Sequence, residues 1–276
     1  MNQSLLQIID KALNQFATHG LSDVNNAKLM DRVDSKFVIP VELLPQLLEK
    51  SRNYYSLLSV DGESLNDYHN VYFDTDNFSY YNMHHNGKLN RIKVRHRHYR
   101  TSGAAFLEIK FKSNTGRTLK TRIPADTDAK RAIAEHKDFL LDQGVSDLGK
   151  LQPSQIVGYQ RICLASESLG ERVTLDTKAS FVDPVSGREV VLNDVVIIEL
   201  KQRRIDRQSP FYRLLRSLGM RPQSFSKYCA GVSMTTTNRV KTNRFKGDIN
   251  KVTKLSNSLN TSFSSSFSSS LRTISA

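Results

Sequence analysis

Cysteine is scarce in this chain of 276 residues, and several other features are missing with it. Cys163 and Cys229 are too few for a disulfide framework. The chain also has no long apolar stretch, and its first residues lack the basic segment that begins a secretory leader. We therefore expect no signal peptide, no membrane-spanning helix and a reducing, cytoplasmic setting in which both cysteines serve as packing residues.

Short motifs for nucleotides and metals are absent as well. The sequence contains no phosphate-binding loop, no dinucleotide fingerprint, no kinase signature and no zinc spacing of cysteine and histidine. Nucleic acid is disfavoured as a partner because phenylalanine and tyrosine do not interleave with the basic strands as in a stacking platform.

Acidic residues are the other shortage, since 27 Asp and Glu stand against 40 Lys and Arg. The resulting net charge of +13 indicates a polyanionic partner, which by charge alone is nucleic acid, a phosphate-rich metabolite or an anionic membrane. With 38% hydrophobic residues over this length, the chain can bury a substantial core.

What the sequence does contain is a series of strands with one charged face and one apolar face. In residues 91–99 every second residue is basic, and alternate side chains of a strand share a face. Residues 106–112 and 195–203 repeat the pattern with acids among the bases. His96 and His98 lie opposite the basic residues of their strand, so we expect both to point away from any site.

The expected elements run along the whole chain. The first element is an amphipathic helix that ends at Gly20 and packs against the main domain. The strands and helices after it are located by turn residues and by the periodicity of apolar residues. Strands are expected near residues 32–40, 69–74, 89–100, 104–112, 118–123, 156–165, 171–177 and 195–203, and helices near 41–51, 126–141 and 209–218. The predicted organisation is an N-terminal helix (1–24), one main domain (25–240) and a basic, serine-rich, disordered tail (241–276).

About eight strands predict an α+β protein built on an antiparallel barrel or strongly curved sheet, with helices packed outside. The apolar strand faces suit the helices, which leaves the charged faces inside. Each uncompensated buried charge would cost about 3–5 kcal/mol, against a typical net stability of about 5–15 kcal/mol. The interior must therefore be wet, partly self-paired and suited to anions.

The same argument from strand faces gives candidate roles to individual charged residues. Mixed arginine and lysine suits a phosphate chain, because arginine offers a bidentate fork and lysine a compact charge. Asp34, Glu108 and Glu199 each lie two residues from a base on the same face, so they are candidate oxygen ligands for Mg²⁺ or Mn²⁺. The cations that lie opposite apolar neighbours are Arg95, Arg97, Lys110, Lys120, Arg122, Arg161, Arg172 and Lys201.

An ordered set of short segments resembles a known family. Over about residues 28–235 the chain is similar to the VTC domain, which belongs to the CYTH-like triphosphate tunnel metalloenzymes and includes polyphosphate polymerases. The segments that carry the resemblance are Arg32–Phe37, Val71–Thr75, Asn86–Gly87, Arg95–Tyr99, Leu107–Lys110, Lys120–Arg122, Tyr159–Arg161, Arg172–Asp176, Ile198–Lys201 and Phe225–Tyr228.

The resemblance implies an eight-stranded antiparallel tunnel with a basic interior, and it implies roles for particular residues. Glu199 would be the main ligand of Mn²⁺ or Mg²⁺, with Glu108 as a second. Asp34 and Phe37 depart from the Glu and Tyr usual in the family, so a metal role for Asp34 is doubtful. The implied catalytic residues are Lys36, Arg95, Arg97 and Lys227, and the implied substrate-binding residues are Lys110, Lys120, Arg122, Tyr159, Arg161, Arg172, Lys201 and Ser226.

The function that the resemblance implies is a polyphosphate polymerase that transfers the terminal phosphoryl group of ATP to a growing chain. Its partners would be ATP and polyphosphate, and the sequence gives no indication of oligomeric state. Two alternatives stay open: a metal-dependent tripolyphosphatase or nucleotidase of the same fold, and a non-catalytic sensor or scaffold that binds polyphosphate.

Overall fold

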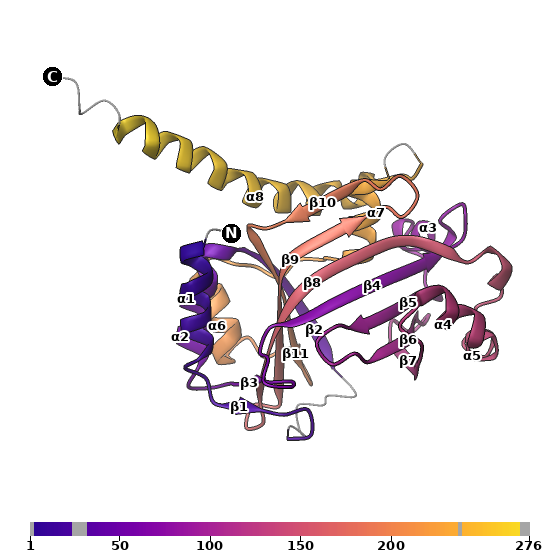
Figure 1. Cartoon of the computed structure of the whole chain (residues 1–276), viewed down its shortest axis with the longest axis horizontal. Helices are drawn as coiled ribbons and strands as arrows, with labels where there is room; N and C mark the ends of the chain where they lie inside the picture. Colours follow the sequence, from indigo (N-terminus) through magenta and orange to yellow (C-terminus); the bar gives the residue numbers. More distant parts are fainter. Residues whose placement is uncertain (1–2, 24–31, 237–238, 271–276) are drawn as a thin grey trace.

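The computed structural model describes residues 3–23, 32–236 and 239–270, with residues 257–270 described by their backbone alone (Figure 1). A large sheet with helices on both sides makes up the α+β fold. In chain order its elements are α1 Gln3–Leu13, β1 Thr18–His19, β2 Val33–Pro40, η2 Val41–Leu43, α2 Leu44–Ser51, β3 Ser56–Leu58, β4 Asn66–Asp74, α3 Ser79–His85, β5 Arg91–Tyr99, β6 Ala105–Lys112, β7 Thr118–Pro124, α4 Ala129–Glu135, α5 Lys137–Asp142, η3 Leu148–Lys150, β8 Gln152–Ser166, β9 Glu171–Val182, β10 Glu189–Leu192, β11 Val195–Gln202, α6 Pro210–Ser217, α7 Lys227–Thr235 and α8 Asn243–Ser270.

The sheet has eleven strands, and eight of them form one continuous path, β2-β11-β9-β8-β4-β5-β6-β7. Neighbours along this path are antiparallel, whereas β1 pairs with β3 in parallel. Between the described residues of the two end strands, β2 and β7, there is no hydrogen-bonded ladder. The sheet is therefore open, and backbone pairing does not close the predicted barrel.

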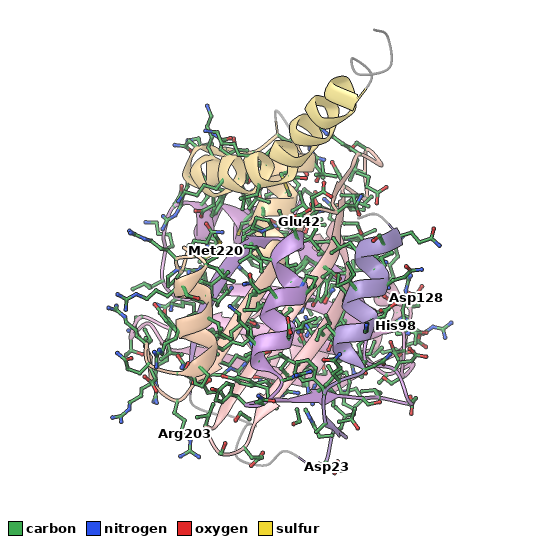
Figure 2. All side chains as sticks on the ribbon, turned by 90° about the vertical axis from the view of Figure 1, so that its left-hand side faces the viewer. Asp23, Glu42, His98, Asp128, Arg203 and Met220 are labelled. Atoms are coloured by element: carbon green, nitrogen blue, oxygen red, sulfur yellow. The ribbon has the colours of Figure 1, made fainter. Side chains whose placement is uncertain are left out.

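The convex face of the sheet carries most of the apolar core. Helices α1, α2 and α6 cover the side formed by β2, β11, β9 and β8, as Figure 2 shows from outside. Phe37 and Leu200 reach 0% exposure there, because alternate residues of each strand point outward beneath the helices. Each such side chain contributes about 1.5–3 kcal/mol on burial. Helix α5 covers β4, β5 and β6 through a second cluster around Leu107 and Leu140.

The concave face is divided between a polar part and an apolar part. Helix α7 lies on the apolar part, where Val232 packs against Val157 and Phe181 of the sheet. Ser226 caps this helix by accepting a hydrogen bond from the Cys229 amide. The start of α7 consequently lies at the border with the polar part.

Most expected strands and helices are present, but several bounds differ. Helix α1 ends at Leu13 rather than Gly20, because the chain turns into β1, which pairs with β3. It does pack on the main domain, as expected, through Ile9 and Leu13. The helix expected over 126–141 is divided at His136 into α4 and α5. Strands β1, β3 and β10 and helices α3 and α7 were not expected.

The predicted disorder from residue 241 onward is wrong for residues 243–270, which form α8. Phe245, Val252 and Leu255 recur on one side of this helix and pack against the cluster around α7, and the serine-rich composition hid that stripe. Arg244 also donates to the His85 carbonyl at the end of α3, over 3.0 Å. Residues 271–276 and the predicted boundary at 24–25 lie outside the described residues.

No described helix combines the length and the apolar character needed to span a bilayer.

Candidate functional site

The polar part of the concave face surrounds a cavity of about 810 Å³. Side chains from both end strands line it, including Lys36 of β2 and Lys120 of β7. Twelve Lys and Arg side chains line the cavity against four Asp and Glu. Every residue given a site role from the sequence is among the lining residues. Those on strands lie on the same face, as strand parity predicts, whereas Ser226 and Lys227 come from the start of α7.

Glu108 lies in the wall formed by β5, β6 and β7 and is 1% exposed. Arg95 donates to its Oε2 through Nε at 2.9 Å and also through Nη2, while Lys120 donates to Oε1 at 2.5 Å. Burial alone would raise the pKa of Glu108, but the charges of Arg95, Arg97 and Lys120 outweigh it and hold the pKa well below its usual range. This carboxylate is ionised and has both oxygens occupied.

Asp176 has the same role in the opposite wall, on β9. Arg161 forms a bidentate pair with it at 2.6 and 2.8 Å, and Lys227 at the start of α7 donates to its Oδ2. Burial opposes ionisation, yet the two cations lower the pKa of Asp176 to about 2. Asp176 lies four residues after Arg172 on the same strand and so shares its face, but the contact with Lys227 depends on a helix 51 residues away in the chain.

Glu199 on β11 is the third acid of the site, and it is half-buried. Lys201 donates to its Oε2, and the Lys36 ammonium lies 3.7 Å from its Oε1. Burial raises the pKa of Glu199, but Lys201, Lys36 and Lys110 hold it well below the usual range. Lys201 also lies 3.8 Å from Asp34 of β2, so Lys201 links these two acids.

Two lysines of the cavity lack an acidic partner among the described residues. Lys93 donates to the Ser226 hydroxyl at 2.9 Å, and Lys110 makes no hydrogen bond or ion pair with any described residue. Burial, followed by nearby cations such as Arg95 and Lys36, lowers the pKa of Lys110 well below its usual value. Burial likewise lowers the pKa of Lys93. A bound anion in the cavity would raise the pKa of both lysines again, because it favours their charged forms.

Arginines and aromatic rings make up the rest of the lining. Arg97 donates to Asn70 and to the Tyr159 hydroxyl, each at 2.9 Å, and lies over the ring of Tyr68. Arg122 stacks on Phe106 at 4.4 Å. These neutral partners orient the guanidinium groups without neutralising them. Arg172 contacts the Cys163 sulfur at 3.3 Å, so this buried cysteine belongs to the cavity wall rather than to simple core packing.

Some residues of the same strands stay outside the cavity. His96 bonds through Nε2 with the Asp126 carbonyl at 2.8 Å, and neither it nor His98 lines the cavity, as expected. Arg91 shares the basic face but donates to Lys88 at the strand end. Lys93 shares that face and does line the cavity, although the sequence analysis gave it no role; strand parity alone was sufficient to include it.

The residues present fit a divalent metal only through a single carboxylate. Within the described residues there is no group of three or more His, Cys, Asp or Glu side chains that is suited to a metal ion. Glu199 is the best placed, because its Oε1 accepts no hydrogen bond from a described residue, and the Lys36 ammonium lies 3.7 Å from it. Mg²⁺ is often held by one or two carboxylates together with substrate phosphates. Glu108 is less suited, since Arg95 and Lys120 occupy both its oxygens.

Comparison with known proteins gives one family. The model of a family described as VTC domain matches residues 31–236. A candidate adenylate cyclase from Bacillus halodurans is structurally similar at 17% identity, covering 71% of this chain and 94% of that one, with a TM-score of 0.48. A Hippeastrum protein, described as a candidate adenylyl cyclase with a dominant triphosphatase activity, is 14% identical, covers 75% and 98%, and also has a TM-score of 0.48. At these levels neither structure indicates what this chain does. A search of curated protein sequences gave no match.

Proposed function

This chain belongs to the VTC domain family, and we propose that it is a polyphosphate polymerase. In the proposed reaction, the terminal phosphoryl group of ATP passes to the end of a polyphosphate chain, and ADP is released. The bond that breaks joins the terminal phosphorus of ATP to its bridging oxygen, and the bond that forms joins that phosphorus to an oxygen of the acceptor phosphate.

The observation that carries the proposal is the excess of positive charge around one cavity. Twelve cations face four acids there, and two of these acids, Glu108 and Glu199, already pair with cations. Lys93 and Lys110 are left to bind an anion with several charges. Because lysines of both β2 and β7 line the cavity, we also propose that the open sheet acts as a tunnel wall around the substrate.

The chain's residues would act by positioning and by charge. Lys93 and Lys110, together with Arg97 and Lys36, would bind phosphate oxygens and neutralise charge on the transferred group. Ser226 and Tyr159 would orient Lys93 and Arg97, to which they are hydrogen-bonded. The attacking oxygen belongs to an ionised phosphate, so no strong base is needed to activate it. The Glu108 and Asp176 pairs would hold Arg95, Arg161 and Lys227 in the walls.

A bound Mn²⁺ or Mg²⁺ would add positive charge at the phosphates, and Glu199 would hold it, with the substrate completing the shell.

The test is to incubate the purified chain with ATP and Mn²⁺ or Mg²⁺ and to size the products. Long polyphosphate together with ADP is the expected result, and Lys110→Met should abolish both. ADP with free phosphate and no chain would instead indicate a triphosphatase that uses water as the acceptor. Tight binding without turnover under either metal would indicate a sensor or scaffold.

A further inference from the structure

Residues 202–224 form a strongly basic segment between two parts of the cavity wall, and they do not line the cavity themselves. The chain departs after Lys201 on β11 and comes back at Phe225 and Ser226, before α7. Between them it forms a loop and helix α6 on the convex side of the sheet. Six arginines of this segment form what is here named the arginine face: Arg203, Arg204, Arg207, Arg213, Arg216 and Arg221.

All six arginines are exposed, and none forms an ion pair with any residue that the structure describes. Helix α6 buries Phe211 and Leu215 against the sheet, which leaves Arg213 and Arg216 on its outer side. Figure 2 shows Met220 at the upper end of this helix and Arg203 beyond its lower end, toward the bottom of the molecule. The arginine face therefore extends along the whole of α6.

The segment that carries these arginines contains little that would neutralise them. Asp206 is the only acid in residues 202–226, and its carboxylate accepts a hydrogen bond from the Gln208 amide at 2.8 Å. Six exposed guanidinium groups within one segment that contains a single acid repel each other in the free protein. A bound polyanion would relieve that repulsion.

The composition of the arginine face distinguishes among polyanions. The segment 202–226 contains no lysine, and arginine is the side chain that binds phosphate through two parallel hydrogen bonds. No aromatic ring is exposed in it, since Phe211 and Tyr212 are buried, so bases of a nucleic acid would find no stacking partner. Ile205 is its only exposed large apolar residue, which is too little to anchor a membrane surface. A chain of bare phosphates fits best.

We propose that the arginine face binds the part of a polyphosphate chain that extends beyond the cavity, an inference that rests on the function proposed above. The first arginine lies two residues beyond Lys201, which lines the cavity, so the positive surface begins where the cavity ends. Held in this way, a long chain would dissociate more slowly than a short one.

The experiment compares two fourfold variants of the full chain. Arg203→Gln, Arg207→Gln, Arg213→Gln and Arg216→Gln are combined in the first. Lys11→Gln, Lys50→Gln, Lys130→Gln and Lys137→Gln form the control, which removes the same charge from exposed positions on other helices. Dissociation constants for long polyphosphate and for tripolyphosphate are measured at two salt concentrations, with unfolding by urea as the check on folding.

The expected result is that the arginine variant binds long polyphosphate at least about tenfold more weakly and with a shallower salt dependence. Its affinity for tripolyphosphate, and the control's affinity for both probes, should stay within about twofold. Three results would each overturn the proposal: an equal loss of affinity for long polyphosphate in the two variants, an unchanged affinity for long polyphosphate in the arginine variant, or a loss of tripolyphosphate affinity in that variant as large as its loss for long polyphosphate. So would a larger arginine-dependent affinity for single-stranded RNA or for anionic vesicles.

These outcomes separate the inference from the proposed function, because the binding measurements require no turnover. A chain that yields only ADP and phosphate from ATP refutes the polymerase, while an arginine-dependent affinity for long polyphosphate still supports the binding surface.

Discussion

Two regions of the cavity differ in how their positive charges are balanced. In the walls, Glu108 and Asp176 each pair with two cations and are almost completely buried. At the start of α7, Lys93 has only a neutral hydroxyl partner, and Lys110 has no partner among the described residues. We call these the paired walls and the unpaired site. The same residue types, on the same strands, therefore serve two different purposes.

The difference separates cations that maintain the fold from cations that are available to a substrate. Removing one member of a buried pair leaves a buried charge uncompensated, which costs about 3–5 kcal/mol. Removing an unpaired lysine leaves no such charge and reduces repulsion within the cavity. Loss of function alone would not distinguish the two groups, whereas stability and binding measured together would do so.

The largest expected effect comes from breaking a paired wall. Arg95→Met should lower the free energy of unfolding by about 3–5 kcal/mol, because Glu108 stays buried with Lys120 as its only close partner. Urea unfolding measures this loss.

The double variant Arg95→Met with Glu108→Gln serves as the control, since it removes the uncompensated carboxylate as well. It should recover more than half of the lost stability. If the double variant were as unstable as the single one, Glu108 would not be the reason for the loss.

The next effect sharpens the contrast at the unpaired site. Lys110→Met should weaken tripolyphosphate binding about ten- to a hundredfold, which corresponds to the loss of a charged hydrogen bond of about 1.5–3 kcal/mol. Its free energy of unfolding should stay the same or rise. Calorimetric titration and urea unfolding measure the two quantities.

Lys112→Met is the matched control, because Lys112 lies on the same strand and the same face but does not line the cavity. A substantial loss of stability in Lys110→Met, or an equal loss of affinity in Lys112→Met, would contradict the division into two regions.

A smaller effect concerns pH. Burial, partly offset by Glu108, lowers the pKa of Lys120 to about 8. Lys120 belongs to a paired wall but also lines the cavity, so loss of its charge lowers the total positive charge around the substrate. A lysine loses its charge as pH rises through its pKa, so affinity for tripolyphosphate should fall above about pH 8, and binding should take up protons there. Calorimetry in two buffers of different ionisation enthalpy measures the uptake. Lys120→Arg stays charged and should shift the fall in affinity to higher pH. If affinity had the same pH dependence in this variant and in the native protein, titration of Lys120 would not be the cause of the fall.

The smallest effect lies at the border of the unpaired site. Ser226→Ala removes the cap of α7 and the partner of Lys93, and should cost about 1 kcal/mol of stability with a modest loss of affinity. Ser226→Thr retains a hydroxyl and should recover both. Thermal unfolding and titration measure the pair, and an alanine variant equal to the native protein in both would show that the hydroxyl is dispensable.

Much of the fold was accessible from sequence because the strands have a strict alternation. The strands were expected to have an apolar face opposite the charges, and Phe37, Ile198 and Leu200 on that face form the core under α1, α2 and α6. Alternation could not reveal whether β2 and β7 pair, since closure of a sheet depends on its curvature. Helix α8 was missed because three apolar side chains, spread over eleven residues, are stabilised only by the surface they contact.

The sequence indicated which residues lie around the cavity, but not which of them form ion pairs with each other. Strand parity and the family resemblance together grouped Lys36, Arg95, Lys110 and Glu199, and all four line one cavity. They did not indicate that Glu108 is fully occupied by Arg95 and Lys120, or that Lys227 reaches Asp176. Ion pairs of this kind join strands or helices that are distant in sequence.

The sequence by itself determined which residues face the same side, because a strand alternates its side chains with a period of two wherever it lies. It also determined the excess of positive charge, and with it the anionic character of any partner. Only the tertiary structure decided which cations are neutralised, since burial and distance between elements set the strength of each pair. That decision leaves Lys93 and Lys110 unpaired beside α7.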